Sequence, residues 1–110
     1  MRRAVLLPFL ALLLLLPSLA STQTPGEFLQ QGLEAYEAED WDKAERLLLK
    51  SLYSSDDGEQ LTLEDEGLAN WYLGNIWGFY GDLDYARIAY SRTLEIEVET
   101  LGWNHEYTNV

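Results

Sequence analysis

The sequence predicts an all-α fold of antiparallel helix-turn-helix repeats, stacked as a short solenoid of two repeats plus the start of a third. The main observation is self-similarity at a spacing of 42 residues: Gly32 maps to Gly74, Asp40 to Asp82, Ala44 to Ala86, Leu48 to Tyr90 and Leu52 to Leu94. Fixed-period similarity of this kind is typical of units that bury their apolar faces only by stacking. In addition, cap and turn residues divide the chain into four expected helices.

The first two expected helices form one hairpin. Thr-Pro-Gly-Glu at 24–27 is a capping box with proline at the first helical position, so a helix should begin near Pro25 and end near Glu39. Asp40 can cap a second helix, whose apolar residues recur on one face: Ala44, Leu47, Leu48 and Leu52. The stretch Ser-Ser-Asp-Asp-Gly at 54–58 then ends that pattern.

The next two expected helices form a second hairpin. Thr62, with Asp65 three residues later, predicts a helix that runs to about Tyr80. Gly-Asp at 81–82 supplies a C-terminal glycine and the next cap, so a fourth helix should run to about Leu101. Its tail at 95–99 alternates like a strand, but no turn precedes it and no second strand exists to pair with it, so we expect helix.

Small residues recur where the paired helices should cross. Gly32 and Ala44 lie on either side of the first turn, and Gly74 and Ala86 lie on either side of the second. Small side chains let helix axes approach closely, so we expect each glycine to face its alanine.

The first twenty residues predict a secretory signal peptide. Two arginines precede the apolar run 4–16, and Ser18 and Ala20 are small enough for the processing peptidase, so we expect cleavage after Ala20 and a secreted or periplasmic protein. A retained membrane anchor is disfavoured because the run falls short of the roughly 20 residues that span a bilayer. Without cysteine, the chain can form neither a disulfide nor a lipoprotein attachment. The expected layout is a signal peptide at 1–20, a linker at 21–24, repeat 1 at about 25–61, repeat 2 at about 62–103 and an incomplete third repeat from 104.

The charge balance restricts the partners. The chain has 7 basic and 19 acidic residues and a net charge of −12; loss of Arg2 and Arg3 with the leader leaves 5 against 19, or −14. This field repels phosphate and anionic lipid, which argues against binding to nucleic acid or membrane and favours either a basic partner or a merely solvated acidic surface. Four Trp and seven Tyr argue against disorder.

The second repeat resembles the tetratricopeptide family through Leu73-Gly74, Trp77, Ala86 and Tyr90. The spacing of 42 and the stretch Leu-Gly-Trp-Asn-His at 101–105 resemble the longer variant found in kinesin light chains. The first repeat departs from the pattern at Gln31, Ala35 and Leu48. This resemblance implies a right-handed superhelix in which the first helix of each repeat lines a concave peptide-binding groove.

Carried over by position, the resemblance implies groove residues from both repeats: Leu29, Leu33, Tyr36, Glu37, Trp71, Asn75 and Phe79. In this family an asparagine at the position of Asn75 often bonds a ligand's backbone or terminal carboxylate, and an amide offers both donors and an acceptor. An ordinary bond between helices is an equally good reading of Asn75. Of Trp71, Tyr72 and Trp77, only one or two can face inward, and whichever is left exposed is the expected anchor.

Residue patterns typical of catalytic, cofactor and metal sites are missing. His-Glu-Tyr-Thr-Asn at 105–109 begins like a zinc-protease motif but has Asn109 in place of the second histidine, and the calcium-loop spacing around Asp57 fails at Tyr53 and Gln60. We therefore expect no enzyme activity, cofactor or metal site, weak calcium binding at the surface being left open, but an exported module that binds a protein or peptide. The alternatives are the regulatory or targeting front of a larger exported enzyme, or a self-associating scaffold.

Overall fold

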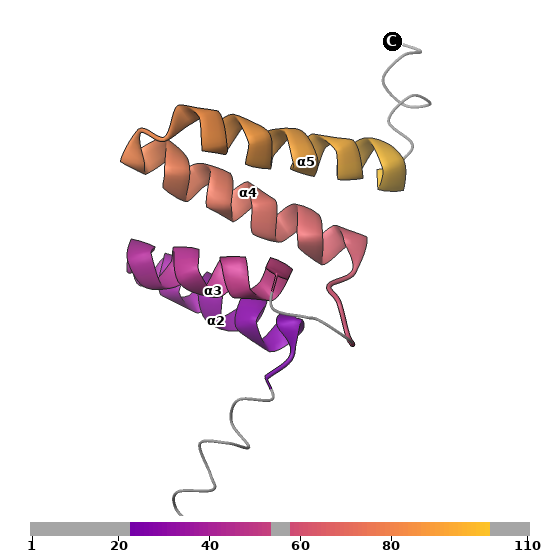
Figure 1. Ribbon diagram of the computed structural model, residues 1–110, viewed down its shortest axis with the longest axis horizontal. Helices are drawn as coiled ribbons and strands as arrows, with labels where there is room; N and C mark the ends of the chain where they lie inside the picture. The colour runs from indigo at the N-terminus through magenta and orange to yellow at the C-terminus, as the bar shows by residue number, and fades with distance from the viewer. Residues whose placement is uncertain (1–22, 54–57, 102–110) are drawn as a thin grey trace, which may run out of the picture.

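The computed structural model describes residues 23–53 and 58–101, and all regular structure in this part of the chain is helical (Figure 1). The four helices are α2 (Pro25–Glu37), α3 (Trp41–Tyr53), α4 (Leu63–Tyr80) and α5 (Leu83–Leu101). The all-α prediction is confirmed, and each predicted boundary lies within about two residues of the observed one. The expected signal peptide, the start of a third repeat and the motif at 105–109 lie outside the described residues.

The local signals act as predicted at the helix starts. The Thr24 hydroxyl accepts from the Glu27 amide and the Glu27 carboxylate accepts from the Thr24 amide, both at 3.1 Å, which completes the capping box of α2. Thr62 caps α4 by accepting from the Asp65 amide at 3.2 Å. Residues 95–99 are helical, because they continue α5 without a break.

Both hairpin turns use a left-handed residue, and the two residues are 42 positions apart. Gly81 ends α4 with φ 83°, and Glu39, 42 residues earlier, has φ 61°. This conformation costs glycine almost nothing but strains a residue with a Cβ atom. The two turns are therefore alike in backbone shape although their sequences differ.

Each hairpin packs within itself, and the two pack on one another (Figure 1). Helix α2 lies along α3 and α4 lies along α5, while α4 also contacts both helices of the first hairpin. The core is formed by small and aliphatic side chains: Leu29, Ala35, Ala44, Leu47, Leu48, Ala69, Leu73, Ile76 and Ala89. Among the described residues, no helix is long and apolar enough to cross a membrane.

The glycines of the two hairpins have equivalent nearest neighbours, which lie one turn beyond the alanines that the sequence pairs with them. A Cβ atom on Gly32 would lie 3.0 Å from the Leu48 side chain, and one on Gly74 would lie 2.6 Å from the Tyr90 ring. The nearest atoms thus belong to the residue one turn beyond the alanine, so each glycine packs most closely against Leu48 or Tyr90. The side chains of Leu48 and Tyr90 are long enough to reach across to the glycine, while the alanines are simply buried.

Candidate functional site

The candidate site is built around Tyr36, which lies on α2 where the two hairpins contact one another. Its ring meets Tyr72 of α4 edge to face at 4.6 Å between centroids, and Trp41 of α3 in the same way at 5.2 Å. Aromatic rings in such T-shaped arrangements stabilise each other beyond their burial. Tyr36 of α2 is thus held by rings from two other helices, α3 and α4.

Asn75 joins Tyr36 to α5. Its Nδ2 donates to the Tyr36 hydroxyl at 3.3 Å, and its Oδ1 accepts from the Tyr90 hydroxyl at 2.5 Å. The amide therefore makes the bond between helices that the sequence left open as an alternative to ligand binding. It retains one N–H and one acceptor lone pair, because an amide offers two of each.

Three predicted residues follow one stripe of α4 at spacings of four. Trp71 is 48% exposed and its ring lies 5.2 Å from that of Tyr90, whereas Phe79 is 63% exposed and lies 5.2 Å from Trp41. Asn75 is half-buried between them. Leu68 continues the stripe and is also exposed; its spacing from Trp71 could have revealed it in the sequence.

The predicted residues of α2 differ in their surroundings. Glu37 is exposed, and Leu33 is half-buried against the core. Leu29 is 5% exposed and belongs to the core itself. In the structure Tyr36 and Asn75 are therefore in contact and Glu37 is exposed to solvent, whereas Leu29 is buried and cannot contact a ligand.

The charges are distributed unevenly over the described helices. All five described cations lie on α3 and α5: Lys43, Arg46, Lys50, Arg87 and Arg92. The charged side chains of α2 and α4 are all acidic: Glu27, Glu34, Glu37, Glu64, Asp65 and Glu66. Both helices thus carry acidic but no basic residues, and α4 adds exposed aromatic side chains, although Glu66 is turned toward Arg92 of α5.

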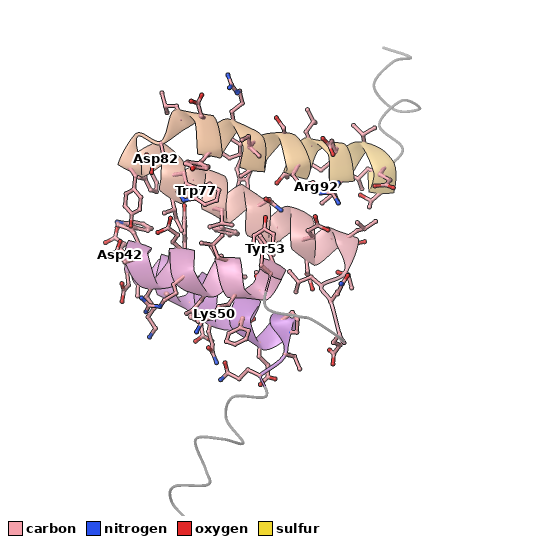
Figure 2. All side chains as sticks on the ribbon, in the orientation of Figure 1. Asp42, Lys50, Tyr53, Trp77, Asp82 and Arg92 are labelled. Carbon is pink, nitrogen blue, oxygen red and sulfur yellow. The ribbon has the colours of Figure 1, made fainter. Side chains whose placement is uncertain are left out.

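Polar contacts hold α4 on α3. The Trp77 indole N–H donates to Glu45 at 2.6 Å and the Tyr80 hydroxyl donates to Asp42 at 2.5 Å. Asp42 lies at the same end of the molecule as Asp82 in the second turn (Figure 2). The hydrogen bond to Asp42 raises the pKa of Tyr80 from 10.0 to about 12, with desolvation and nearby carboxylates acting in the same direction.

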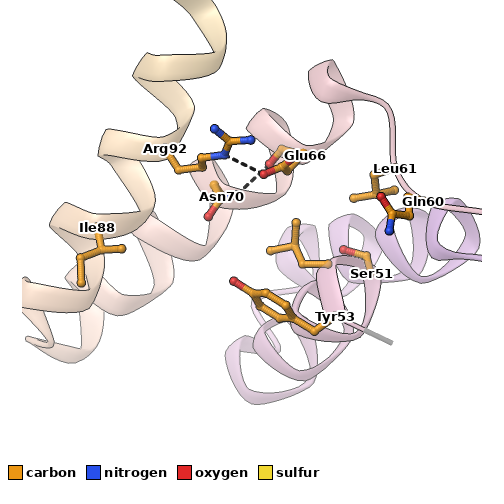
Figure 3. A pocket seen from close by; sticks show the side chains of 9 residues that line it. Ser51, Tyr53, Gln60, Leu61, Glu66, Asn70, Ile88 and Arg92 are labelled. Atoms are coloured by element: carbon orange, nitrogen blue, oxygen red, sulfur yellow. Dashed lines mark hydrogen bonds and ion pairs between the residues drawn. The ribbon is translucent and has the colours of Figure 1, made fainter. Parts of the chain in front are cut away.

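A separate hollow of about 380 Å³ opens between α3 and α5 (Figure 3). Arg92 donates to Glu66 in it at 2.7 Å, which raises the pKa of the guanidinium, and the buried Asn70 donates to the Glu66 carbonyl at 3.0 Å. Because Arg92 is already paired with carboxylates, this hollow offers no free cation for an anionic ligand.

Within the described ranges, no group of three or more histidine, cysteine, aspartate or glutamate residues could hold a metal ion. Neither a protein-family model, a curated protein nor a solved structure matches this chain. The function therefore has to be inferred from the chain's own residues.

Proposed function

We propose that the protein is an exported binding module of tetratricopeptide-like repeats, which captures a basic segment of another protein on the face formed by α2 and α4. The observation that carries the proposal is the separation of charge: α2 and α4 carry acidic but no basic residues, α4 has exposed aromatic side chains, and all described cations lie on the other two helices. The solenoid arrangement and export are part of the proposal. They rest on the 42-residue similarity and on the leader-like first twenty residues.

The chemistry of the face suits lysine- or arginine-containing peptides. Phe79 and Trp71 offer exposed rings, over which a cation is attracted to the π electrons. Glu37 can pair with a second cation on the ligand, and the remaining N–H and lone pair of Asn75 can bond the ligand's backbone. Such a surface would raise the association rate of basic partners more than it would slow their dissociation. Because salt screens this attraction, the affinity should fall as the ionic strength rises.

The test is selection from a random peptide library on the immobilised protein. We expect enrichment of peptides with basic and apolar residues, and about tenfold weaker binding of the selected peptides to Phe79→Ala and to Glu37→Lys. Tyr53→Ala and Glu99→Lys are matched controls, because both positions are exposed on helices outside the face. Equal losses in variants and controls, or selection of acidic peptides, would contradict the proposal.

A further inference from the structure

We propose that α5 is a dimerisation helix that packs antiparallel against α5 of a second copy of this chain, with a twofold axis at residue 92. The inference does not depend on the proposed function, because it concerns α5 and not α2 or α4, although Tyr90 of α5 also contacts Trp71 of the proposed binding face. It starts from a row of side chains along α5 whose spacing alternates between four and three residues: Leu83, Arg87, Tyr90, Leu94, Glu97 and Leu101. This is the spacing of a coiled-coil seam.

The three leucines of this seam are uncovered, while Tyr90 is half-buried against α4. Leu83 is 69%, Leu94 50% and Leu101 63% exposed, and a hollow of about 370 Å³ lies along the first half of the seam, lined by Leu83, Ala86, Arg87, Tyr90, Ser91 and Leu94. Aliphatic side chains at regular spacing along one helix face usually pack against another helix.

The seam is self-complementary in the antiparallel direction. About an axis at residue 92, Leu83 faces Leu101 of the second copy, Tyr90 faces Leu94, and Arg87 faces Glu97. A twofold interface requires this symmetry, because each residue must suit the residue opposite and also be suited by it. The only basic and the only acidic side chain of the seam therefore meet, which gives charge complementarity as well as apolar contact.

The two charges of the seam are available for this contact. Among residues 23–53 and 58–101, Arg87 is paired only with Asp84, 3.2 Å away, and both side chains are largely exposed, so this pair is weak. Glu97 is exposed, and no ion pair involves it within the described part of the chain.

Comparison with the first hairpin shows why a second α5, rather than a further stacked hairpin, is the occupant. Forty-two residues earlier the same face is covered by α4: Trp41, equivalent to Leu83, touches Phe79, and Tyr36 touches Tyr72. Stacking there thus uses residues of both helices of the hairpin. In the second hairpin, Leu83 of α5 is the apolar equivalent of Trp41, but the equivalent of Tyr36 is Gly78, which has open space around it. A further hairpin would therefore find no side chain on α4 at this position.

The first measurement is sedimentation velocity at about 0.15 M salt, which limits the repulsion between two acidic chains. The chain is expressed at full length and purified as the host processes it. We expect a concentration-dependent dimer, and a monomer at every concentration up to the millimolar range would overturn the proposal. Leu94→Glu should abolish the dimer, while Ile88→Glu, a matched change on the opposite side of α5 where Ile88 is 64% exposed, should leave it unchanged.

Charge reversal then tests the pairing. Arg87→Glu and Glu97→Arg should each weaken the dimer at least about tenfold, because each change places like charges opposite one another twice in the symmetric interface. The two changes together should restore it. Both sites are exposed, so folding should be unaffected, and circular dichroism will check this. Failure of the double variant to recover would overturn the register.

Cysteine cross-linking tests the direction, since the natural chain has no cysteine. Leu83→Cys combined with Leu101→Cys should form a covalent dimer on oxidation. Leu83→Cys alone should not, because two copies of that residue would lie about 27 Å apart along antiparallel helices. Efficient cross-linking of the single variant would indicate a parallel dimer and overturn the proposal.

Discussion

Replacing glycines of α4 by alanine should give opposite effects on stability at two positions of the same helix. Gly78 has open space around it, so Gly78→Ala should stabilise the protein by about 0.5–1 kcal/mol, the usual gain from removing glycine's backbone freedom. Gly74→Ala gains the same local term but places a methyl group against Tyr90.

The cost at Gly74 follows from the distances. The new Cβ atom would lie 2.6 Å from Cε1 and 2.7 Å from Cδ1 of the Tyr90 ring, so the ring must move by about 1 Å to reach ordinary contact. That ring is held by its hydrogen bond to Asn75 and by Trp71. Overpacking costs about 1–3 kcal/mol and a strained hydrogen bond about 1 kcal/mol, which leaves a net loss of about 1–3 kcal/mol after the local gain.

Urea denaturation followed by circular dichroism measures both changes. The two variants should differ by about 1.5–4 kcal/mol in free energy of unfolding, with unchanged denaturant dependence. Gly67→Ala is an intermediate case, because its Cβ atom would lie 3.3 Å from Ile96 and a small shift suffices. If Gly74→Ala were as stable as Gly78→Ala, the close crossing of α4 and α5 would be refuted. Tyr90→Leu should reduce the penalty of Gly74→Ala, since a smaller side chain can move away.

Three further predictions concern the turn, the pH dependence and the leader. Glu39→Gly should stabilise the protein by about 0.5–1 kcal/mol in urea denaturation, because φ 61° strains glutamate; an unchanged midpoint would contradict this. Tyr80 has its pKa raised in the folded state to about 12, so its stabilising contribution is complete below about pH 10 and lost toward pH 12; the absorbance of tyrosinate should show a late-titrating group that Asp42→Asn moves toward pH 10. The mass of the exported protein should begin at Ser21, and a mass that includes Met1 would instead indicate a retained anchor.

The helices could be predicted because their signals are local. A hydroxyl at Thr24 or Thr62 can satisfy an amide three residues later whatever the rest of the chain does, so the cap fixes the start of the helix. Gly81 likewise ends α4 through its own backbone conformation. The turn at Glu39 was less evident, since glutamate carries no sign of a left-handed conformation. The sequence predicts the position of this turn from Asp40, which can cap the next helix, but it does not predict the left-handed backbone.

Contacts between helices could be predicted less well, because they depend on how each helix is rotated and on the length of each side chain. The spacing suggested that Gly74 would meet Ala86, but the ring of Tyr90 reaches it first. Similarly, no local pattern connects Trp41 with Phe79. The exposed stripe of α4 was largely foreseen, whereas its neighbours on α3 and α5 appeared only in the structure.

Asn75 shows why structural and ligand-binding roles cannot be separated by removing the side chain. Its Oδ1 accepts from Tyr90 and its Nδ2 donates to Tyr36. Asn75→Ala would therefore remove hydrogen bonds that connect α2, α4 and α5, whether or not a peptide binds. One N–H and one lone pair of the Asn75 amide remain. They can donate to the C=O and accept from the N–H of a ligand's peptide group. The amide can therefore hold the helices and still bind a ligand backbone. The groove has to be tested at Glu37, which is exposed, and at Phe79, whose ring contacts Trp41 of α3, so circular dichroism must confirm the fold of Phe79→Ala.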